Sequence, residues 1–278
     1  MTSPPAPLVV DCHLHVGRTS EWGEDIRKLH APFEARNLLH LALDPDGAMT
    51  PEGVLRVLDA SGVDRAVVIS AGEAQNEWVL AFGRATPRLA PVVSLDPSGP
   101  DRAAQARTLA RLLEAGARGL KLYPTYHHFM PDDPTLFALY ETLAAHGRPV
   151  IVHTGSSVFH QSRLKFGLPL LLDDVAVAFP ALPVVLAHAG RPLWYDQAFE
   201  LARLHRNVHL DLSGIPPRSL LTAFPRLERL PDQVLFGTDW PSMPGIARSL
   251  AEIRALPLPD DVRDRLLGAN AARLFGFE

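Results

Sequence analysis

The chain has 278 residues, of which 47% are hydrophobic and 21% are charged, a composition typical of soluble globular proteins. The formal net charge of -4 at pH 7 argues against a nucleic-acid-binding protein, which would carry a basic stripe. The single cysteine, Cys12, excludes an intramolecular disulfide and fits a reducing compartment. No apolar stretch approaches the roughly 18 residues of a membrane span, and residues 1–10 lack a signal-peptide pattern. We therefore expect a cytoplasmic protein with no membrane partner.

Short apolar runs alternate with longer amphipathic stretches along the whole chain. The predicted strands cover residues 8–15, 65–70, 89–95, 118–124, 149–155, 183–190, 208–214 and 234–241. Amphipathic stretches at 51–61, 101–115, 134–146 and 195–206 lie between them, and a last one covers 260–275. Strands that alternate with helices predict a parallel sheet, and eight such units at this length predict a single (β/α)8 TIM barrel domain over residues 1–278. An open doubly wound sheet is the competing fold, but no GxGxxG motif follows the first strand.

The segment 17–49 is too long for a simple turn between the first strand and the first long helix, whose predicted N-cap is Thr50. It contains Trp22, His30 and His40. Long loops after barrel strands lie at the carboxyl ends of the strands and commonly form lids. We predict a lid or specificity loop here, with a plain surface insertion as the alternative.

Polar residues fall on one of the two alternating faces of several predicted strands. Because barrel strands are covered on both faces, they should be almost wholly apolar. The polar face carries the following residues: Asp11, His13 and His15 in the first strand, Lys121 and Tyr123 in the fourth, Ile151 and His153 in the fifth, Val184, Leu186 and His188 in the sixth, His209, Asp211 and Ser213 in the seventh, and Gly237 and Asp239 in the eighth. We predict that this face looks toward the barrel axis. The opposite face, with Val10, Cys12 and Leu14 in the first strand, should pack against the helices.

Imidazoles and a carboxylate at the strand ends indicate a divalent metal site. Neutral histidine nitrogens and an aspartate oxygen suit Zn²⁺, which we expect, and also Mn²⁺, Fe²⁺ or Co²⁺. His13 and His15 are spaced i, i+2 and can bind one ion together, while His153 and Asp239 would complete the set. Four such ligands leave a position open for water, which is typical of a catalytic site rather than a structural one.

At these residues the sequence resembles the amidohydrolase superfamily of metal-dependent barrel enzymes. The matching segments are 11–15 (DCHLH), 153–155 (HTG), 188–190 (HAG), 237–241 (GTDWP) and 268–276 (GANAARLFG). Together they are most similar to the amidohydrolase-related branch, which holds pyrone-dicarboxylate lactonase-like hydrolases and aminocarboxymuconate-semialdehyde decarboxylase-like enzymes. The resemblance covers essentially the whole chain.

The resemblance implies a role for each matching residue. His13, His15 and His153 would bind the metal. Asp239 would bind it or transfer protons. His188 would polarise the substrate or position water, and in binuclear relatives it binds a second ion.

Lys121 departs from a single-metal site. The segment 119–124 (GLKLYP) is similar to the fourth strand of dihydroorotase-type members, in which such a lysine is carboxylated and bridges two metals. Lys28, Lys121 and Lys165 are the only lysines of the chain, and an unpaired ammonium among leucines would be costly. The alternatives to carboxylation are pairing with an acidic neighbour or with a substrate carboxylate.

We predict a metal-dependent hydrolase of a small amide, lactone or ester, in which metal-activated water attacks a carbonyl and Asp239 handles the proton. The candidate substrate contacts are Tyr123, His127, His128, Arg191 and Trp240, with Arg191 as a clamp for a carboxylate. The alternative function is metal-dependent non-oxidative decarboxylation of a small carboxylic acid. A barrel that only binds a ligand is a third hypothesis, but it should have lost some of the metal ligands. The expected partner is a small-molecule substrate, and the sequence leaves a homodimer open.

Overall fold

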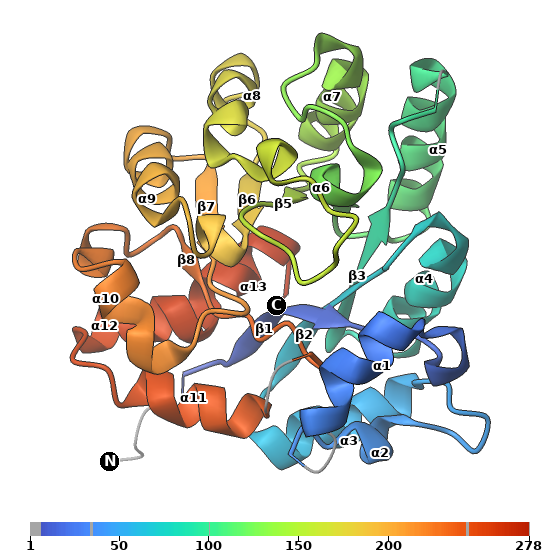
Figure 1. The fold of residues 1–278 in the computed structure, drawn as a ribbon, viewed down its shortest axis with the longest axis vertical. Coiled ribbons are helices and arrows are strands. Elements are labelled where there is room, and N and C mark those ends of the chain that lie inside the picture. The colour runs from blue at the N-terminus through green and yellow to red at the C-terminus, as the bar shows by residue number, and fades with distance from the viewer. Residues whose placement is uncertain (1–6, 34–35, 100, 243–244, 278) are drawn as a thin grey trace.

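Eight parallel strands surround one axis in the computed structural model of the chain, with helices on their outer side (Figure 1). The structure describes residues 7–33, 36–99, 101–242 and 245–277. The strands are β1 (Val10–His15), β2 (Arg65–Ile69), β3 (Leu89–Ser94), β4 (Leu120–Leu122), β5 (Val150–His153), β6 (Val184–Ala187), β7 (Val208–Asp211) and β8 (Val234–Leu235). Each strand pairs in parallel with the next in chain order.

The barrel closes through hydrogen bonds between β1 and the residues at and after β8. The N–H of Cys12 donates to the carbonyl of Phe236 over 2.9 Å, and the N–H of His15 donates to that of Trp240 over 2.8 Å. The N–H of Asp239 returns a bond of 2.9 Å to the carbonyl of His13. The predicted (β/α)8 barrel is therefore confirmed, since the first and last strands meet.

The helices follow the strands in the order expected of a barrel. They are α1 (Glu24–His30), α2 (Leu39–Ala42), α3 (Pro51–Ser61), α4 (Asn76–Ala85), α5 (Arg102–Glu114), α6 (Pro124–His127), α7 (Phe137–Ala145), α8 (Asp173–Ala178), α9 (Tyr195–Leu204), α10 (Leu220–Ala223), α11 (Ile246–Arg254), α12 (Asp260–Asp264) and α13 (Asn270–Phe275). Thr50 is the N-cap of α3, as predicted, because its hydroxyl accepts a 3.0 Å bond from the N–H of Gly53. Every helix of the described residues is too short or too polar to cross a membrane.

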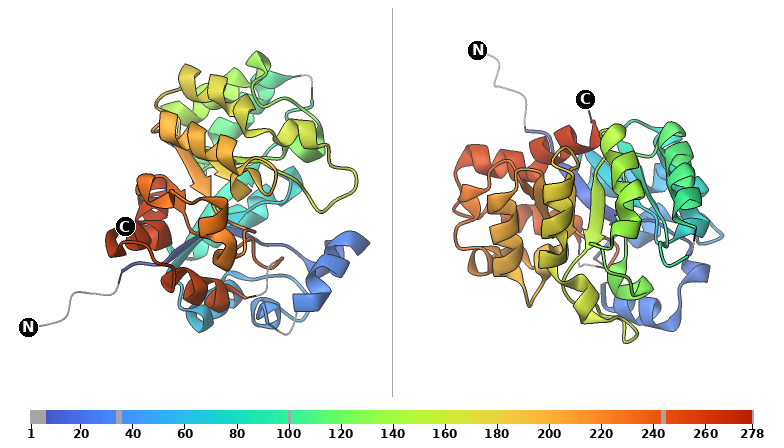
Figure 2. Two further views of the ribbon diagram at one scale, coloured as in Figure 1. Left: turned by 60° about the vertical axis from the view of Figure 1, so that its left-hand side comes forward. Right: turned by 90° about the horizontal axis from the view of Figure 1, so that it is seen from above.

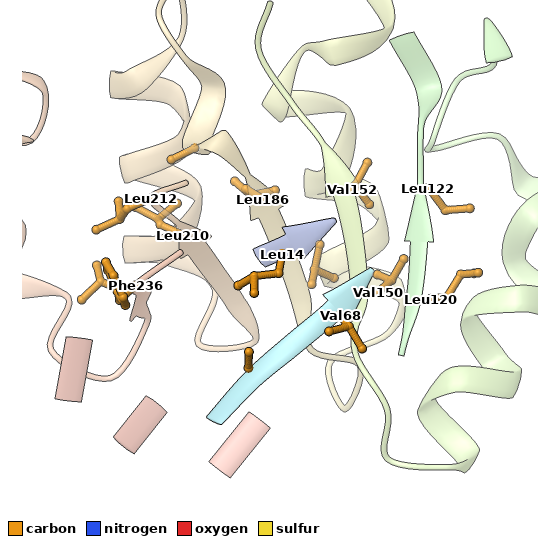
Figure 3. Close-up of a cluster of buried hydrophobic side chains, with 14 of the residues drawn as sticks. Leu14, Val68, Leu120, Leu122, Val150, Val152, Leu186, Leu210, Leu212 and Phe236 are labelled. Carbon is orange, nitrogen blue, oxygen red and sulfur yellow. The ribbon is translucent and has the colours of Figure 1, made fainter. Parts of the chain in front are cut away.

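Buried apolar side chains form two clusters, one on each side of the strands. The outer cluster fills the space between strands and helices, and Figure 3 labels ten of its members: Leu14, Val68, Leu120, Leu122, Val150, Val152, Leu186, Leu210, Leu212 and Phe236. The inner cluster comprises Val10, Cys12, Val67, Ile69, Ala90, Val92, Ile151, Val185, Ala187, Leu235, Ala271 and Phe275. Each fully buried large aliphatic side chain contributes about 1.5–3 kcal/mol of transfer free energy.

The predicted faces hold for β4, β5 and β7 but are wrong for part of β1. The register of β1 against β2 shifts between Asp11 and Leu14. Because of this irregularity, Val10 and Cys12 lie in the inner cluster, whereas Leu14 lies in the outer one. One extra residue on a strand reverses the direction of all side chains that follow it, which is why strict alternation fails here.

The prediction for β6 is also wrong. Val184 and Leu186 belong to the outer cluster, and Val185 and Ala187 belong to the inner one. His188 follows the strand rather than continuing its alternation. Its φ is 63°, in the left-handed region, and this bend separates the direction of its side chain from that of Leu186.

The described residues of the segment 17–49 lie on the side of the barrel to which the strands' carboxyl ends point, and their role as a lid or specificity loop stays a prediction. Within its described residues, Asn37 donates a 3.0 Å side-chain bond to the carbonyl of Pro241, which follows β8. In the right-hand view of Figure 2, blue α1 lies at the bottom while red α13 lies at the top, so the two elements occupy opposite ends of the barrel.

Candidate metal centre

Four side chains meet at the carboxyl ends of β1, β4 and β8. The Nε2 atoms of His13 and His15 are 3.2 Å apart. The Oδ1 atom of Asp239 lies 3.7 Å from Nε2 of His13 and 3.4 Å from Nε2 of His15. The Nζ atom of Lys121 lies 3.5 Å from Nε2 of His13. His13, His15 and Asp239 were predicted as metal ligands, and Lys121 was predicted as a further ligand if it is carboxylated.

His13 is held by a carboxylate behind it. Its Nδ1 lies 2.5 Å from Oδ2 of Asp211 and 3.2 Å from Oγ of Ser213. Burial by itself would raise the pKa of Asp211, but the contact with His13 and the N–H of Ser213 outweigh burial and hold that pKa below its usual range. Asp211 is therefore a pure acceptor, so His13 must donate from Nδ1. The lone pair of its Nε2 then faces His15 and Asp239, as in the carboxylate–histidine pairs of metal sites.

Two further histidines lie next to this group. Nδ1 of His188 is 3.1 Å from the carbonyl oxygen of Ser213 and 3.0 Å from its Oγ. Because a carbonyl only accepts, His188 donates from Nδ1 and its Nε2 carries the free lone pair. Single ligand atoms of His13, His188 and Asp239 lie within 4.8 Å of one another. The ring of His153 lies next to that of His188, with 4.7 Å between the two ring centroids. The Nε2 atom of His153 is 3.3 Å from the carbonyl oxygen of Ser156.

Burial sets the charge state of these imidazoles. It lowers the pKa of His153 to about 3 and that of His188 well below its usual value, and the ammonium of Lys121 or neighbouring histidines add to the effect. Burial and Lys121 also lower the pKa of His13. The three rings are therefore neutral at pH 7, and neutral imidazole is the form that binds a metal ion.

The backbone at Asp239 is shaped to bring its carboxylate inward. Its φ is 64°, a left-handed conformation that non-glycine residues rarely adopt away from functional sites. The preceding residue, Thr238, is fixed to Asp11 by a hydroxyl bond of 2.6 Å and an N–H bond of 3.0 Å. Gly237 leaves the necessary space, because a Cβ there would lie 2.5 Å from Oδ1 of Asp211. Asp11, which the sequence placed on the polar face, therefore supports the turn rather than the ion.

The donor atoms fit a divalent cation. Two imidazole nitrogens and a carboxylate oxygen lie 3.2–3.7 Å from one another, and lone pairs that face one another at this distance are stabilised by a shared proton or a cation. Nitrogen and oxygen ligands of this kind suit Zn²⁺ and its neighbours in the first transition row. Lys121 has no carboxylate within ion-pair distance among the described residues. Burial lowers its pKa to about 8.

A match to a protein-family model shows the family to which this chain belongs. Residues 10–277 match the family model described as amidohydrolase. The chain belongs to the amidohydrolase family. The resemblance read from the motif segments is thereby confirmed.

Solved structures with the same barrel are similar to this amidohydrolase over nearly its whole length. The 5-carboxyvanillate decarboxylase of Sphingomonas paucimobilis shares 20% identity at a TM-score of 0.72, covering 98% of this chain and 100% of that one. A zinc-bound amidohydrolase of Burkholderia multivorans shares 19% at 0.71, covering 98% and 100%. A probable 2-pyrone-4,6-dicarboxylic acid hydrolase of Acinetobacter baumannii shares 16% at 0.69, covering 97% and 99%. None of the curated proteins compared with the chain matches it.

The predicted substrate contacts of this amidohydrolase lie at different depths. The hydroxyl of Tyr123 is buried and donates to the carbonyl of Ser70 over 2.8 Å. Arg191 follows His188 and donates a 2.6 Å bond to the carbonyl of Gly214. In the loop after β4, His127 Nδ1 lies 3.3 Å from Oδ1 of Asp96. His128 Nε2 lies 3.0 Å from the carbonyl of Gln161.

Trp240 is placed elsewhere. Its side chain is fully buried in the outer cluster, and its indole N–H donates to the carbonyl of Asn37 over 2.5 Å. It points toward the helix side of the barrel and ties the segment 17–49 to the end of β8. We therefore replace the predicted substrate contact with a structural role for Trp240.

Three residues near the centre had no role in the sequence analysis. Asp211 and Ser213 were on the predicted polar face, and that position was the only signal for them. Tyr126 had no such signal, because it lies in the short helix α6 rather than on a strand. Its ring centroid lies 5.0 Å from that of His153, and its hydroxyl accepts a 2.9 Å bond from Ser157.

Proposed function

We propose that this amidohydrolase is a metal-dependent hydrolase of small amides, lactones or esters. His13, His15, His153 and Asp239 would hold the cation, with Zn²⁺ as the expected ion and Mn²⁺ as the alternative. The observation that carries the proposal is the position of Asp239, whose carboxylate lies within 3.7 Å of Nε2 of both His13 and His15. The side chain of Asp239 is 18% exposed, so it can contact a substrate as well as the proposed metal ligands.

A bound divalent cation supplies a Lewis acid, which polarises a carbonyl and lowers the pKa of water from 15.7 toward about 7. Asp239 is suited to take the proton. Burial would raise the pKa of its carboxyl, but the bond to His15 and the nearby His188 and His13 outweigh burial, so the pKa lies below its usual value. Asp239 is therefore ionised at neutral pH. It can accept a proton from the attacking water and return it to the leaving group, as a general base and then a general acid.

The remaining residues of the site would bind and orient the substrate. His188, fixed through its Nδ1 by Ser213, presents its other nitrogen to the substrate or to a second ion. Arg191 would bind a substrate carboxylate, since a guanidinium matches its two oxygens. Tyr123, His127 and His128 would contact the substrate on the side of β4. Lys121 would act either as a carboxylated ligand between two ions or as a cation toward the substrate.

Decarboxylation is the second candidate. The likeness to 5-carboxyvanillate decarboxylase favours it, because that protein has the same barrel over its whole length. A 2,6-dihydroxybenzoate decarboxylase is also similar, at 19% identity and a TM-score of 0.66. In this reaction the carboxylate of the substrate would take the place of the attacked carbonyl. Asp239 would first take a proton from water or from the substrate and then deliver it to the carbon atom that loses CO₂.

The test is metal analysis of the purified protein followed by a turnover screen. The chain is stripped with a chelator, reloaded with Zn²⁺ or Mn²⁺, and offered small lactones, amides, esters and aromatic carboxylic acids. Acid release without CO₂ would support hydrolysis, and CO₂ release would support decarboxylation. Equal turnover before and after stripping would exclude both, because each needs the cation.

A further inference from the structure

A cavity lies at the amino ends of the strands, at the opposite end of the barrel from the metal centre. Its volume is about 610 Å³. It is lined by residues at the starts of β2 and β3, by the connections that precede β4 and β5, and by the end of α13. In the right-hand view of Figure 2, α13 occupies the end of the barrel away from α1, so the cavity and the lid segment lie far apart.

Four arginines line this cavity, together with apolar side chains. The arginines are Arg65, Arg84, Arg118 and Arg148, and the apolar residues include Leu80, Pro87, Phe275 and Phe277. A cavity of this size is within the range of roughly 300–1,000 Å³ that small-molecule sites occupy. Because the lining combines arginines with apolar side chains, it suits a ligand that has an anionic group and an apolar part.

Arg118 and Arg148 converge on one point. A Cβ built on Gly276 would lie 3.1 Å from a terminal nitrogen of Arg118 and 3.4 Å from one of Arg148. Burial and the neighbouring charge of Arg118 lower the pKa of Arg148. Among the residues with described positions, neither guanidinium has a carboxylate within ion-pair distance. Two half-buried like charges repel each other, and an oxyanion between them would remove the repulsion.

We propose that this cavity binds a small organic oxyanion, a carboxylate or phosphate ester with an apolar body, independently of the metal centre. The paired guanidinium groups of Arg118 and Arg148 would hold the charged oxygens through charge-assisted bonds, which Arg forms with bidentate geometry. The wall of Phe275 and Phe277 would receive the apolar part. This site shares no residue with the proposed metal centre, so its existence can be tested independently of the proposed function.

The test is calorimetric titration with phenyl phosphate and, in parallel, inorganic phosphate at low ionic strength. We expect one site per chain, tighter binding of phenyl phosphate, and weaker binding as salt is added. Arg118→Gln and Arg148→Gln should each weaken binding at least tenfold, the usual loss when a charged hydrogen-bond partner is removed. Arg206→Gln, an exposed arginine in the connection between α9 and β7, is the matched control and should leave the affinity unchanged.

Two further variants keep the result unambiguous. His13→Ala, which disrupts the metal centre, should leave phenyl phosphate binding intact, and loss of binding in it would place the anion at the metal centre and overturn the proposal. Arg148→Lys keeps the charge and should bind more tightly than Arg148→Gln, which separates loss of a contact from loss of the fold. Affinity that is the same in wild type and Arg148→Gln would also overturn it.

Discussion

His13 donates a hydrogen bond from its Nδ1 to Oδ2 of Asp211 over 2.5 Å, and this contact joins β1 to β7 across 198 residues of sequence. Both side chains are fully buried. The bond fixes the tautomer of His13, so that the lone pair of Nε2 faces His15 and Asp239. Asp211 is thus a positioning residue, and it acts on the proposed metal ligand without touching the metal position itself.

Replacing Asp211 should weaken metal binding, because Asp211 orients the proposed ligand His13. In Asp211→Asn the charge that raises the basicity of His13 is gone, and outer partners of this type are worth 10–100-fold in metal affinity. We expect a loss of that size for Zn²⁺, measured by competition with a chelating dye. Asp196→Asn, an exposed aspartate at the start of α9, is the control. An unchanged Zn²⁺ affinity in Asp211→Asn would mean that the contact does not tune the ligand.

Replacing Asp239 should separate binding from turnover. The amide of Asp239→Asn can still ligate weakly, but it cannot carry a proton. We expect turnover to fall by 10²–10⁴, the usual contribution of general acid–base catalysis, while the far-UV circular dichroism stays that of the wild type. A mutant within about tenfold of wild type would remove Asp239 from proton transfer. The Asp196→Asn variant is again the control, and its turnover should stay that of the wild type because it removes a carboxylate that takes no part in the site.

The barrel could be predicted from sequence because eight apolar strands alternate with amphipathic helices over a length typical of a closed barrel, and the motif of the competing doubly wound sheet is absent after the first strand. The direction of individual side chains could be predicted only where a strand is regular. Lys121 was placed correctly because Leu120 and Leu122 flank it in an unbroken strand. His188 was assigned to the wrong alternation, because its left-handed backbone ends the regular strand and no pattern of residue types encodes that bend.

The residues that orient the side chains of the site could not be predicted from the sequence, for a different reason. The motif segments carry His13, His188 and Asp239, but the partners that orient them come from β7, which carries none of those segments. Ser213 contacts both His13 and His188, and a serine at a strand end has many ordinary uses. Such partners depend on which strands become neighbours, and only the closed barrel shows this.

Lys121 should decide between one metal ion and two. Its Nζ lies 3.5 Å from Nε2 of His13, and burial lowers its pKa to about 8, so a reactive neutral amine is accessible at mildly alkaline pH. If it reacts with CO₂, the carbamate would bridge two ions roughly 3.5–4 Å apart. We expect metal content to rise from one toward two ions per chain with bicarbonate in the buffer, and mass spectrometry to show the added carboxyl group. One ion per chain under both conditions would leave the mononuclear mechanism.

The control for this experiment is Lys165→Gln, since Lys165 is exposed and lies over the ring of Phe166. It should respond to bicarbonate as the wild type does. Lys121→Gln should hold one ion regardless of bicarbonate. Two ions in Lys121→Gln would show that His153 and His188 bind the second ion without help from the lysine.

His209 should make the fold sensitive to acid. It is buried in β7, and burial lowers its pKa to about 4, with Arg273 lowering it further and Asp232 opposing. In the unfolded chain a histidine titrates near 6.5, so below that pH the unfolded state binds a proton that the folded state does not. The stability present above pH 6.5 is therefore lost as the pH falls toward 4. We expect the free energy of unfolding of the metal-free chain, from urea titrations, to fall by about 2 kcal/mol more between pH 7 and pH 5 in wild type than in His209→Gln. His146→Gln, an exposed histidine after α7, should behave as wild type. An equal loss in wild type and His209→Gln would show that His209 protonates inside the folded barrel without penalty.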